Sequence, residues 1–205
     1  MNVEGPLNRF KPLLTSLNSD GRYGIALLLV CAVLLLPELG GEWARAALRY
    51  ERAAVAGGQW WRLITAHLVH LDLEHAVLNS LGLVLMWSLF ARDYGPRRWL
   101  AIVMATFAAI DAGLYFHDTN VDWYVGASGA LHGVMTAGTL AHVRRGDLDG
   151  WILAVFIIVK LTYEQLSGAL PFSQSGVPVV VNAHLYGALG GVAMAAIMKP
   201  RREPL

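Results

Sequence analysis

The stretch Trp123-Tyr-Val-Gly126-Ala-Ser128-Gly129-Ala-Leu-His132-Gly133 places a serine between glycines, where a polar loop becomes an apolar helix. A serine in this position presents its hydroxyl at a helix N-terminus, where free backbone N–H groups can receive an oxyanion. A serine at a helix start is more often an N-cap than a nucleophile. The interpretation therefore depends on where two other stretches, His75 to Asn79 and His184 to Gly191, lie relative to Ser128.

The composition is more apolar than that of a soluble domain. Of 205 residues, 56% are hydrophobic and 15% are charged, and the mean hydropathy is +0.47. These values indicate a chain that is embedded in a lipid bilayer. The net charge of +1 gives no basic face for nucleic acid, so we expect no nucleic-acid partner. The single cysteine, Cys31, cannot form an internal disulfide.

Six apolar runs predict an all-α polytopic membrane protein with six transmembrane helices. Residues 1–22 read as a short cytoplasmic tail, 23–199 as the membrane domain with a re-entrant first loop at about 38–71, and 200–205 as a second cytoplasmic tail. Several runs are short for a span, so tilt or local bilayer thinning is expected. The predicted spans are Tyr23–Leu36, Asp72–Phe90, Trp99–Phe116, Gly126–Val143, Trp151–Ser167 and Asn182–Met198.

Basic residues set the predicted orientation. Four lie in the first loop, and eleven flank the other ends of the spans, on the side that holds both termini. The positive-inside rule then makes both termini cytoplasmic. The eleven are Arg9, Lys11, Arg22, Arg92, Arg97, Arg98, Arg144, Arg145, Lys199, Arg201 and Arg202.

The even-numbered spans share a direction, so their N-terminal ends share one face of the membrane. His75, Ser128 and His184 each lie within about a turn of such an end, so we expect them to converge at one depth. Asn79 follows His75 by four residues and lies on the same helical face, one turn deeper. Polar groups inside spans are costly and are therefore functional by default.

Small residues give a reason for contact between the fourth and sixth spans. Gly129, Gly133 and Ala137 form one stripe at every fourth position, and Ala183, Gly187, Gly191 and Ala195 form another. Such stripes let helix backbones approach closely. A close crossing would bring the Ser128 hydroxyl and the His184 imidazole within reach, although the glycines could also serve packing alone.

Taken together, these motifs resemble the rhomboid family of intramembrane serine proteases. The resemblance covers about Gln59 to Ala195 and includes Trp61-Arg62, His75-Ala-Val-Leu-Asn79, Gly126-Ala-Ser128-Gly129 and Ala183-His184-Leu-Tyr-Gly187-Ala-Leu-Gly-Gly191. More narrowly, the small six-span form and the sequence around Ser128 and His184 are similar to the bacterial rhombosortases. That resemblance implies substrates anchored in the membrane by a C-terminal tail of Gly-Gly, a membrane segment and basic residues.

The expected chemistry is acyl transfer. Ser128 would attack the scissile carbonyl while His184 takes its proton, forming an acyl-enzyme. The Ser128 backbone N–H and the His75 and Asn79 side chains would hold the oxyanion. No acidic residue is expected to orient His184, because Asp122 lies in the preceding loop and Asn182 points elsewhere, so a Ser-His dyad is predicted.

Other polar residues are given supporting or structural roles. His132, where many rhomboids carry a tyrosine, is expected to stack on His184 as a flat ring that can also titrate. His70 is expected to hydrogen-bond a loop, and His67 to lie at the membrane interface. Lys160 and Glu164, four residues apart, are expected to neutralise each other, and Asp111 to face a polar interior. The cluster of His67, His70, Asp72, Glu74 and His75 lacks the spacing of a zinc motif, so no metal or cofactor is predicted.

The resemblance also implies a location and a substrate. We expect a multi-pass protein of the bacterial inner membrane whose active site opens toward the periplasm. A peptide bond in an intact helix is shielded, and glycine costs a helix roughly 1 kcal/mol relative to alanine, so a Gly-Gly pair would unwind readily. Whether water or an amine resolves the acyl-enzyme stays open. A catalytically inactive client-binding relative and a small transporter are the alternative classes; the transporter fits less well, because the polar set clusters near one face.

Overall fold

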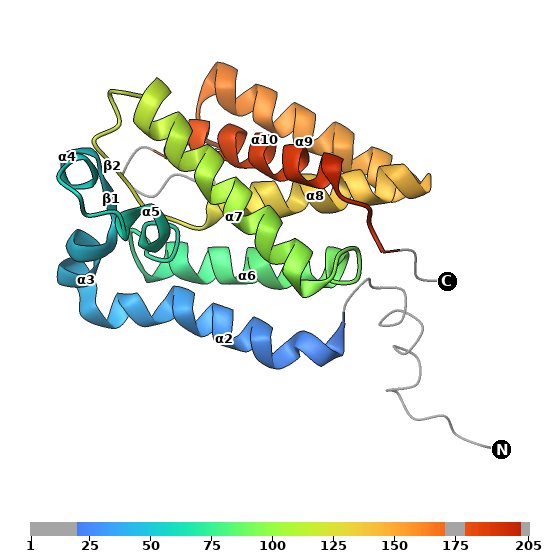
Figure 1. Ribbon diagram of the computed structural model, residues 1–205, viewed down its shortest axis with the longest axis horizontal. Helices are drawn as coiled ribbons and strands as arrows, with labels where there is room; N and C mark the ends of the chain where they lie inside the picture. Colours follow the sequence, from blue (N-terminus) through green and yellow to red (C-terminus); the bar gives the residue numbers. More distant parts are fainter. Residues whose placement is uncertain (1–19, 171–178, 202–205) are drawn as a thin grey trace.

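The computed structural model describes residues 20–170 and 179–201, and most of them are helical (Figure 1). The predicted tails lie mainly outside these ranges. The long helices are α2 (Gly24–Leu35), α6 (Leu73–Phe90), α7 (Pro96–Ala112), α8 (Ser128–Arg145), α9 (Leu148–Ser167) and α10 (Val181–Ile197).

Shorter elements fill the connection between α2 and α6. They are the 3₁₀ turn η3 (Leu36–Gly40), α3 (Gly41–Leu48), β1 (Tyr50–Glu51), α4 (Arg52–Ala56) and α5 (Arg62–Thr65). A 3₁₀ turn, η2 (Gly21–Tyr23), precedes α2; a π-helical turn, η4 (Gly113–His117), ends α7; and β2 (Trp123–Tyr124) precedes α8. Apart from η2, which lies at the start of α2, these short elements gather at one end of the bundle, on the left of Figure 1.

Four helical segments of the described residues are long and apolar enough to cross a membrane. They are Gly21–Leu48, Leu73–Phe90, Pro96–His117 and Leu148–Ser167, and Val181–Ile197 is a shorter apolar helix. The prediction of six spans and of cytoplasmic termini stays a prediction. The α-helix α2 ends at Leu35, within a residue of the predicted end of the first span at Leu36, and the chain then passes through η3, which contains Pro37, into α3. Proline is tolerated there because it occupies the first turn of η3, where its missing N–H has no partner to lose.

The bundle is polar and small-residue-rich inside and apolar outside. Leucine, isoleucine, valine and phenylalanine side chains of α2, α6 and α9 point outward, among them Leu28, Leu81 and Phe156. Glycines, alanines and polar groups such as Asn79, Thr106 and Glu164 are buried. An outward apolar surface suits lipid, and a small-residue interior lets helices approach closely.

The α8–α10 contact is a direct backbone contact between the two predicted stripes. A methyl group on Gly129 would lie 2.8 Å from the Ala183 carbonyl oxygen. A methyl group on Gly187 would collide with the backbone of Gly129, and one on Gly191 with the backbone of Gly133. The predicted close crossing of these helices is therefore confirmed, and it requires glycine at these positions.

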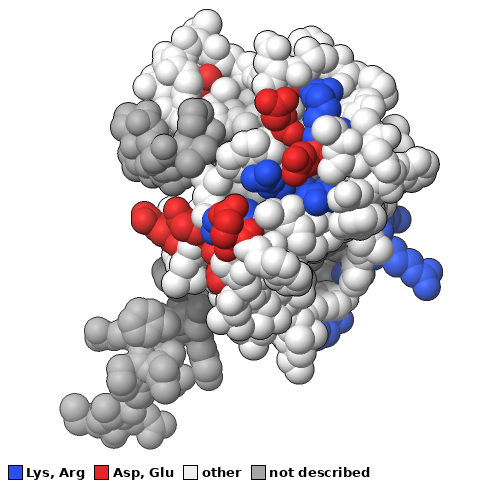
Figure 2. All heavy atoms as spheres, turned by 90° about the vertical axis from the view of Figure 1, so that its left-hand side faces the viewer, with Lys and Arg blue, Asp and Glu red and all other residues white. Residues whose placement is uncertain are grey.

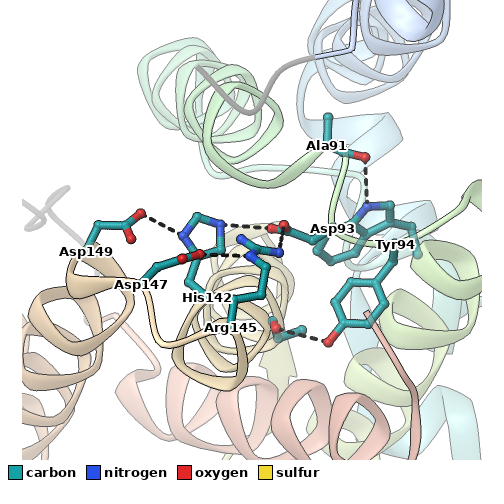
Figure 3. A network of polar contacts seen from close by, with 9 residues as sticks. Ala91, Asp93, Tyr94, His142, Arg145, Asp147 and Asp149 are labelled. Atoms are coloured by element: carbon teal, nitrogen blue, oxygen red, sulfur yellow. Dashed lines mark hydrogen bonds and ion pairs between the residues drawn. The ribbon is translucent and has the colours of Figure 1, made fainter. Parts of the chain in front are cut away.

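At the end of the bundle away from the first loop, a network of charged groups joins the α6–α7 loop to α8 and α9 (Figure 3). Asp93, which is 1% exposed, accepts a hydrogen bond from Arg145 at 2.6 Å and lies 3.1 Å from His142 Nε2. The other ring nitrogen of His142 lies 2.6 Å from Asp149, and Arg145 also bonds Asp147. Buried charges are stable only when paired in this way, so the network fixes how the three elements meet.

Both ends of the described chain lie at this same end. The backbone N–H of Arg201 donates to the Asp93 carbonyl at 2.6 Å, and the Arg144 guanidinium donates to the carbonyls of Ala195, Ala196 and Met198 at the α10 C-terminus. Asp20, the first described residue, precedes η2 and α2, which begin at this end (Figure 1). The cationic Arg144 complements the negative end of the helix dipole.

We expect Gly187→Ala to lower the thermal unfolding temperature in detergent, because its methyl group would force α8 and α10 apart. Overpacking of this kind costs about 1–3 kcal/mol. The matched control is Gly24→Ala in α2, where a methyl group meets nothing within 4 Å. Equal unfolding temperatures for Gly187→Ala and Gly24→Ala would contradict the requirement for glycine.

Candidate active site

Ser128 is the first residue of α8, as the sequence predicts. The N-cap is Ala127, so the serine hydroxyl is not used for capping, and the first backbone N–H groups of the helix have no partner within it. Gly126, two residues earlier, has φ of +120°, a conformation that other residues rarely adopt. A methyl group on Gly126 would also lie 3.0 Å from the His75 ring. Gly126 thus turns the loop into α8 and lets His75 approach.

The first loop positions this turn. Strand β1 pairs antiparallel with β2, with Tyr50 opposite Tyr124, and the Gly126 N–H donates to the Ala66 carbonyl at 2.9 Å. Tyr124 is buried and its hydroxyl donates to the Gly126 carbonyl at 2.8 Å. Backbone bonds from a distant loop therefore fix the segment that carries Ser128.

Two arginine side chains hold the first loop itself. Arg62, 7% exposed, donates to the Ala46 and Arg49 carbonyls and to the Gln59 side chain. Arg52 is half-buried and donates to the carbonyls of Leu114 and Tyr115 in η4 and of Asp118 just after it. Trp61 is half exposed and its indole N–H lies 3.5 Å from the Ala47 carbonyl. Arg62 and Trp61 thus act within the first loop and do not reach Ser128.

Ser128 and His184 meet as predicted. The Ser128 Oγ lies 2.9 Å from the His184 Nε2, and His184 is 5% exposed. His132 stacks on the His184 ring with a centroid distance of 4.2 Å and an interplanar angle of 15°, which confirms the predicted stacking. The His132 Nδ1 lies 2.7 Å from the Ser128 carbonyl oxygen, so this nitrogen carries the proton. Gly187 and Gly191 act through the α8–α10 contact that brings serine and histidine together.

The expectation that no acidic residue is placed beside His184 is wrong. The Glu164 Oε2 of α9 lies 3.0 Å from the His184 Nδ1, while its Oε1 accepts from the Lys160 ammonium at 2.6 Å. The predicted Lys160–Glu164 pair is therefore confirmed but incomplete, because a carboxylate has two oxygens and can serve both partners. The sequence feature that could have indicated a role for Glu164 is a charged pair within an otherwise apolar helix. Asn182 bonds Asp118 instead, as its predicted direction implies.

A cavity of about 290 Å³ opens beside Ser128, and His75 lines it too. The N-terminal ends of α6, α8 and α10 therefore meet at one site, which confirms the predicted convergence. Asn79 is buried one turn below, where its side-chain N–H donates to the His75 carbonyl at 2.9 Å. The other lining residues are Leu71, Asn120, Val121, Asp122, Trp123, Tyr124, Val125, Val179 and Val180.

The remaining histidines near the loop have structural contacts. The His70 Nε2 accepts from the Ala127 N–H at 3.4 Å, which confirms its predicted loop role, and burial with repulsion from His75 lowers its pKa to about 3. His67 is fully buried, so its predicted interfacial position is wrong. Its Nε2 lies 3.3 Å from Asp111, which is the partner that the sequence could not name, and its ring stacks on Phe107.

Two groups of the described residues bring three potential metal ligands within 4.8 Å of one another. The first group is His132, Glu164 and His184. Its two imidazole rings are stacked in nearly parallel planes, and the Lys160 ammonium forms an ion pair with the Glu164 carboxylate. In the second, His142, Asp147 and Asp149, the side chains already bond one another or Arg145. Both groups thus serve as hydrogen-bond networks.

The end of the molecule that carries the cavity is shown in Figure 2. Basic and acidic side chains gather on this face, on an otherwise uncharged surface. The first loop contributes the ion pairs Arg45–Glu42 at 2.6 Å and Arg49–Glu51 at 3.4 Å. Charges of mixed sign give no single field that would attract a polyanion.

The chain belongs to the rhomboid family of intramembrane proteases, because a Rhomboid domain matches residues 57–201. The Bacillus subtilis (strain 168) rhomboid protein YdcA is 30% identical over 149 residues, which cover 73% of this chain and 72% of YdcA. Rhomboid protease GluP of the same organism is 29% identical over 72% of this chain and 28% of its own length. RHOMBOID-like protein 12, mitochondrial, of Arabidopsis thaliana is 25% identical over 70% of this chain and 48% of its own length.

The His70 contact predicts a pH dependence of stability. An unfolded histidine binds a proton below about pH 6.5, whereas the folded protein keeps His70 neutral down to a pKa of about 3. The contribution of neutral His70 to the free energy of unfolding is therefore fully present above about pH 6.5. It is lost progressively as the pH falls toward about 3. We expect His70→Gln, which keeps an acceptor but does not titrate, to show a shallower fall of unfolding temperature over this range. Parallel curves for the two proteins would contradict this.

Proposed function

We propose that this protein is an intramembrane serine endopeptidase that uses Ser128 as nucleophile and His184 as general base. The observation that carries the proposal is the 2.9 Å contact between Ser128 Oγ and His184 Nε2 beside a cavity at the N-terminus of α8. Family membership and the apolar exterior support action on membrane-anchored proteins.

The steps follow from the geometry. His184 takes the Ser128 proton as Oγ attacks the scissile carbonyl, and it returns the proton to the leaving amine to give an acyl-enzyme. The Ser128 N–H and His75, which line the cavity, supply donors to the oxyanion, each worth about 3 kcal/mol in comparable sites. The Asn79 amide has a second N–H beyond the one that bonds the His75 carbonyl, and we assign it a share in the same role.

We further propose the rhombosortase subtype, with cleavage of a C-terminal Gly-Gly sorting tail near the outer face of a bacterial inner membrane. The cavity is walled by Val121, Val125, Val179 and Val180, so an extended backbone without side chains would reach Ser128 with least obstruction. Glycine also weakens a substrate helix by roughly 1 kcal/mol per residue. The placement of basic residues at the end opposite the cavity supports the periplasmic opening.

We expect a fluorophosphonate probe to label the wild-type protein and to fail with Ser128→Ala. His184→Ala should slow labelling by at least about 10³-fold, because the hydroxyl loses its base. Asn79→Ala should keep partial activity. Size-exclusion profiles verify that the variants are folded, and labelling of Ser128→Ala at the wild-type rate would end the assignment.

For the substrate, we expect a model membrane protein with a Gly-Gly tail to be cleaved at least about tenfold faster than its Ala-Ala counterpart, because two glycines cost the helix about 2 kcal/mol more. Mass spectrometry of the products locates the cut in proteoliposomes. Equal rates for the two tails would argue against the subtype while leaving the protease assignment intact.

A further inference from the structure

Glu164 lies between a base and a cation in the interior of the bundle. It is 1% exposed, and its two carboxylate oxygens face different partners: Oε1 accepts from Lys160 at 2.6 Å and Oε2 lies 3.0 Å from His184 Nδ1. Glu164 and Lys160 belong to α9, His184 to α10 and Ser128 to α8. Three helices therefore contribute to one continuous chain of contacts, from Lys160 through Glu164 and His184 to Ser128.

The contact chain selects one tautomer of His184. A neutral imidazole carries one proton, and an ionised carboxylate can only accept, so the proton must lie on Nδ1, facing Glu164. The Nε2 is then a free acceptor directed at the Ser128 hydroxyl, which is the state a general base requires. With the proton on Nε2, His184 could not take the proton of Ser128.

Lys160 keeps Glu164 in its ionised form. A carboxylate buried without a partner is costly, and an adjacent ammonium offsets that cost. The Lys160 side chain is 16% exposed, so its pair with Glu164 is largely shielded from water. The negative charge on Glu164 is thus held where it can stabilise the imidazolium that forms as Ser128 attacks.

We propose that Glu164 is a positioning residue that orients His184 and completes a Ser128–His184–Glu164 triad, with Lys160 fixing the carboxylate. This inference rests on the proposed protease function. A purely structural pairing of Lys160 with Glu164 needs only one carboxylate oxygen, and it would not require the second oxygen to face the ring nitrogen of the base.

The test uses Glu164→Gln in the full-length protein and measures fluorophosphonate labelling as a limiting rate and an inhibition constant. The amide must present its oxygen to Lys160, which is a donor only, so its NH₂ faces His184 Nδ1 and moves the ring proton to Nε2. We expect the limiting rate to fall about 10²- to 10⁴-fold while the inhibition constant stays within about threefold. Loss of general packing would not separate the two constants in this way.

A double variant supplies the decisive arm. In Lys160→Met/Glu164→Gln the ammonium is gone, so the amide is free to turn its oxygen toward His184 Nδ1 and restore the productive tautomer. We expect the double variant to label at least about tenfold faster than Glu164→Gln, which would be a strong non-additive coupling between two residues in contact. The matched control, Glu42→Gln, removes a carboxylate whose partner is Arg45 and whose side chain is 73% exposed.

Each outcome of these labelling experiments bears either on the proposed function or on the role of Glu164. Wild-type labelling that is absent, or unchanged in Ser128→Ala, overturns the proposed protease function itself. With the wild type active, a Glu164→Gln limiting rate within about threefold of wild type overturns the role of Glu164. A double variant as slow as Glu164→Gln assigns the loss to structure and also overturns it. If Glu164→Gln does not fold, as judged by size exclusion and thermal unfolding, the comparison is made in the Lys160→Met background: Lys160→Met/Glu164→Gln, which keeps an acceptor for His184, should label at least about tenfold faster than Lys160→Met/Glu164→Ala, which has none, and equal rates overturn the proposal.

Discussion

Direct contact between the backbones of α8 and α10 is the constraint on which the site depends. Gly129 and Gly187 leave no room for a side chain, so the two helices cross at van der Waals distance near their N-terminal ends. Ser128 precedes the first of these glycines and His184 precedes the second, which places hydroxyl and imidazole 2.9 Å apart. A helix separation set by larger side chains would put the same two groups beyond hydrogen-bond reach.

Ionisable side chains inside the bundle lie in small groups whose members contact one another. This pairing explains how a bundle with so many polar groups in its interior is stable. Lys160 and Glu164 balance each other beside His184, His67 pairs with Asp111, and at the far end Asp93 faces both His142 and Arg145. Isolated charges in such surroundings would be prohibitive, whereas paired ones keep the register between helices. The first set adjoins the reactive serine, and the last joins α8 and α9 to the α6–α7 loop.

The sequence predicts the helices well because apolar runs are local, and it predicts the Ser128–His184 pair because small-residue stripes show that α8 and α10 touch. Apolar runs define α6 through α10 to within a few residues, and glycine periodicity reveals which helices touch. The sequence does not predict the contact of Glu164 with His184, because the two residues lie on different helices, α9 and α10. Only the packing of these helices brings the two side chains together. The His67–Asp111 pair was missed for the same reason, since 44 residues separate them and no periodicity connects them.

The length of α8 has a practical consequence. This helix runs from Ser128 to Arg145, and 18 residues at 1.5 Å each separate its ends by about 27 Å. A fluorophore or surface tether coupled beside Arg145 would therefore stand almost a bilayer's hydrocarbon thickness from the reacting hydroxyl. The protein can be immobilised by that end for single-molecule observation while large clients still reach the other.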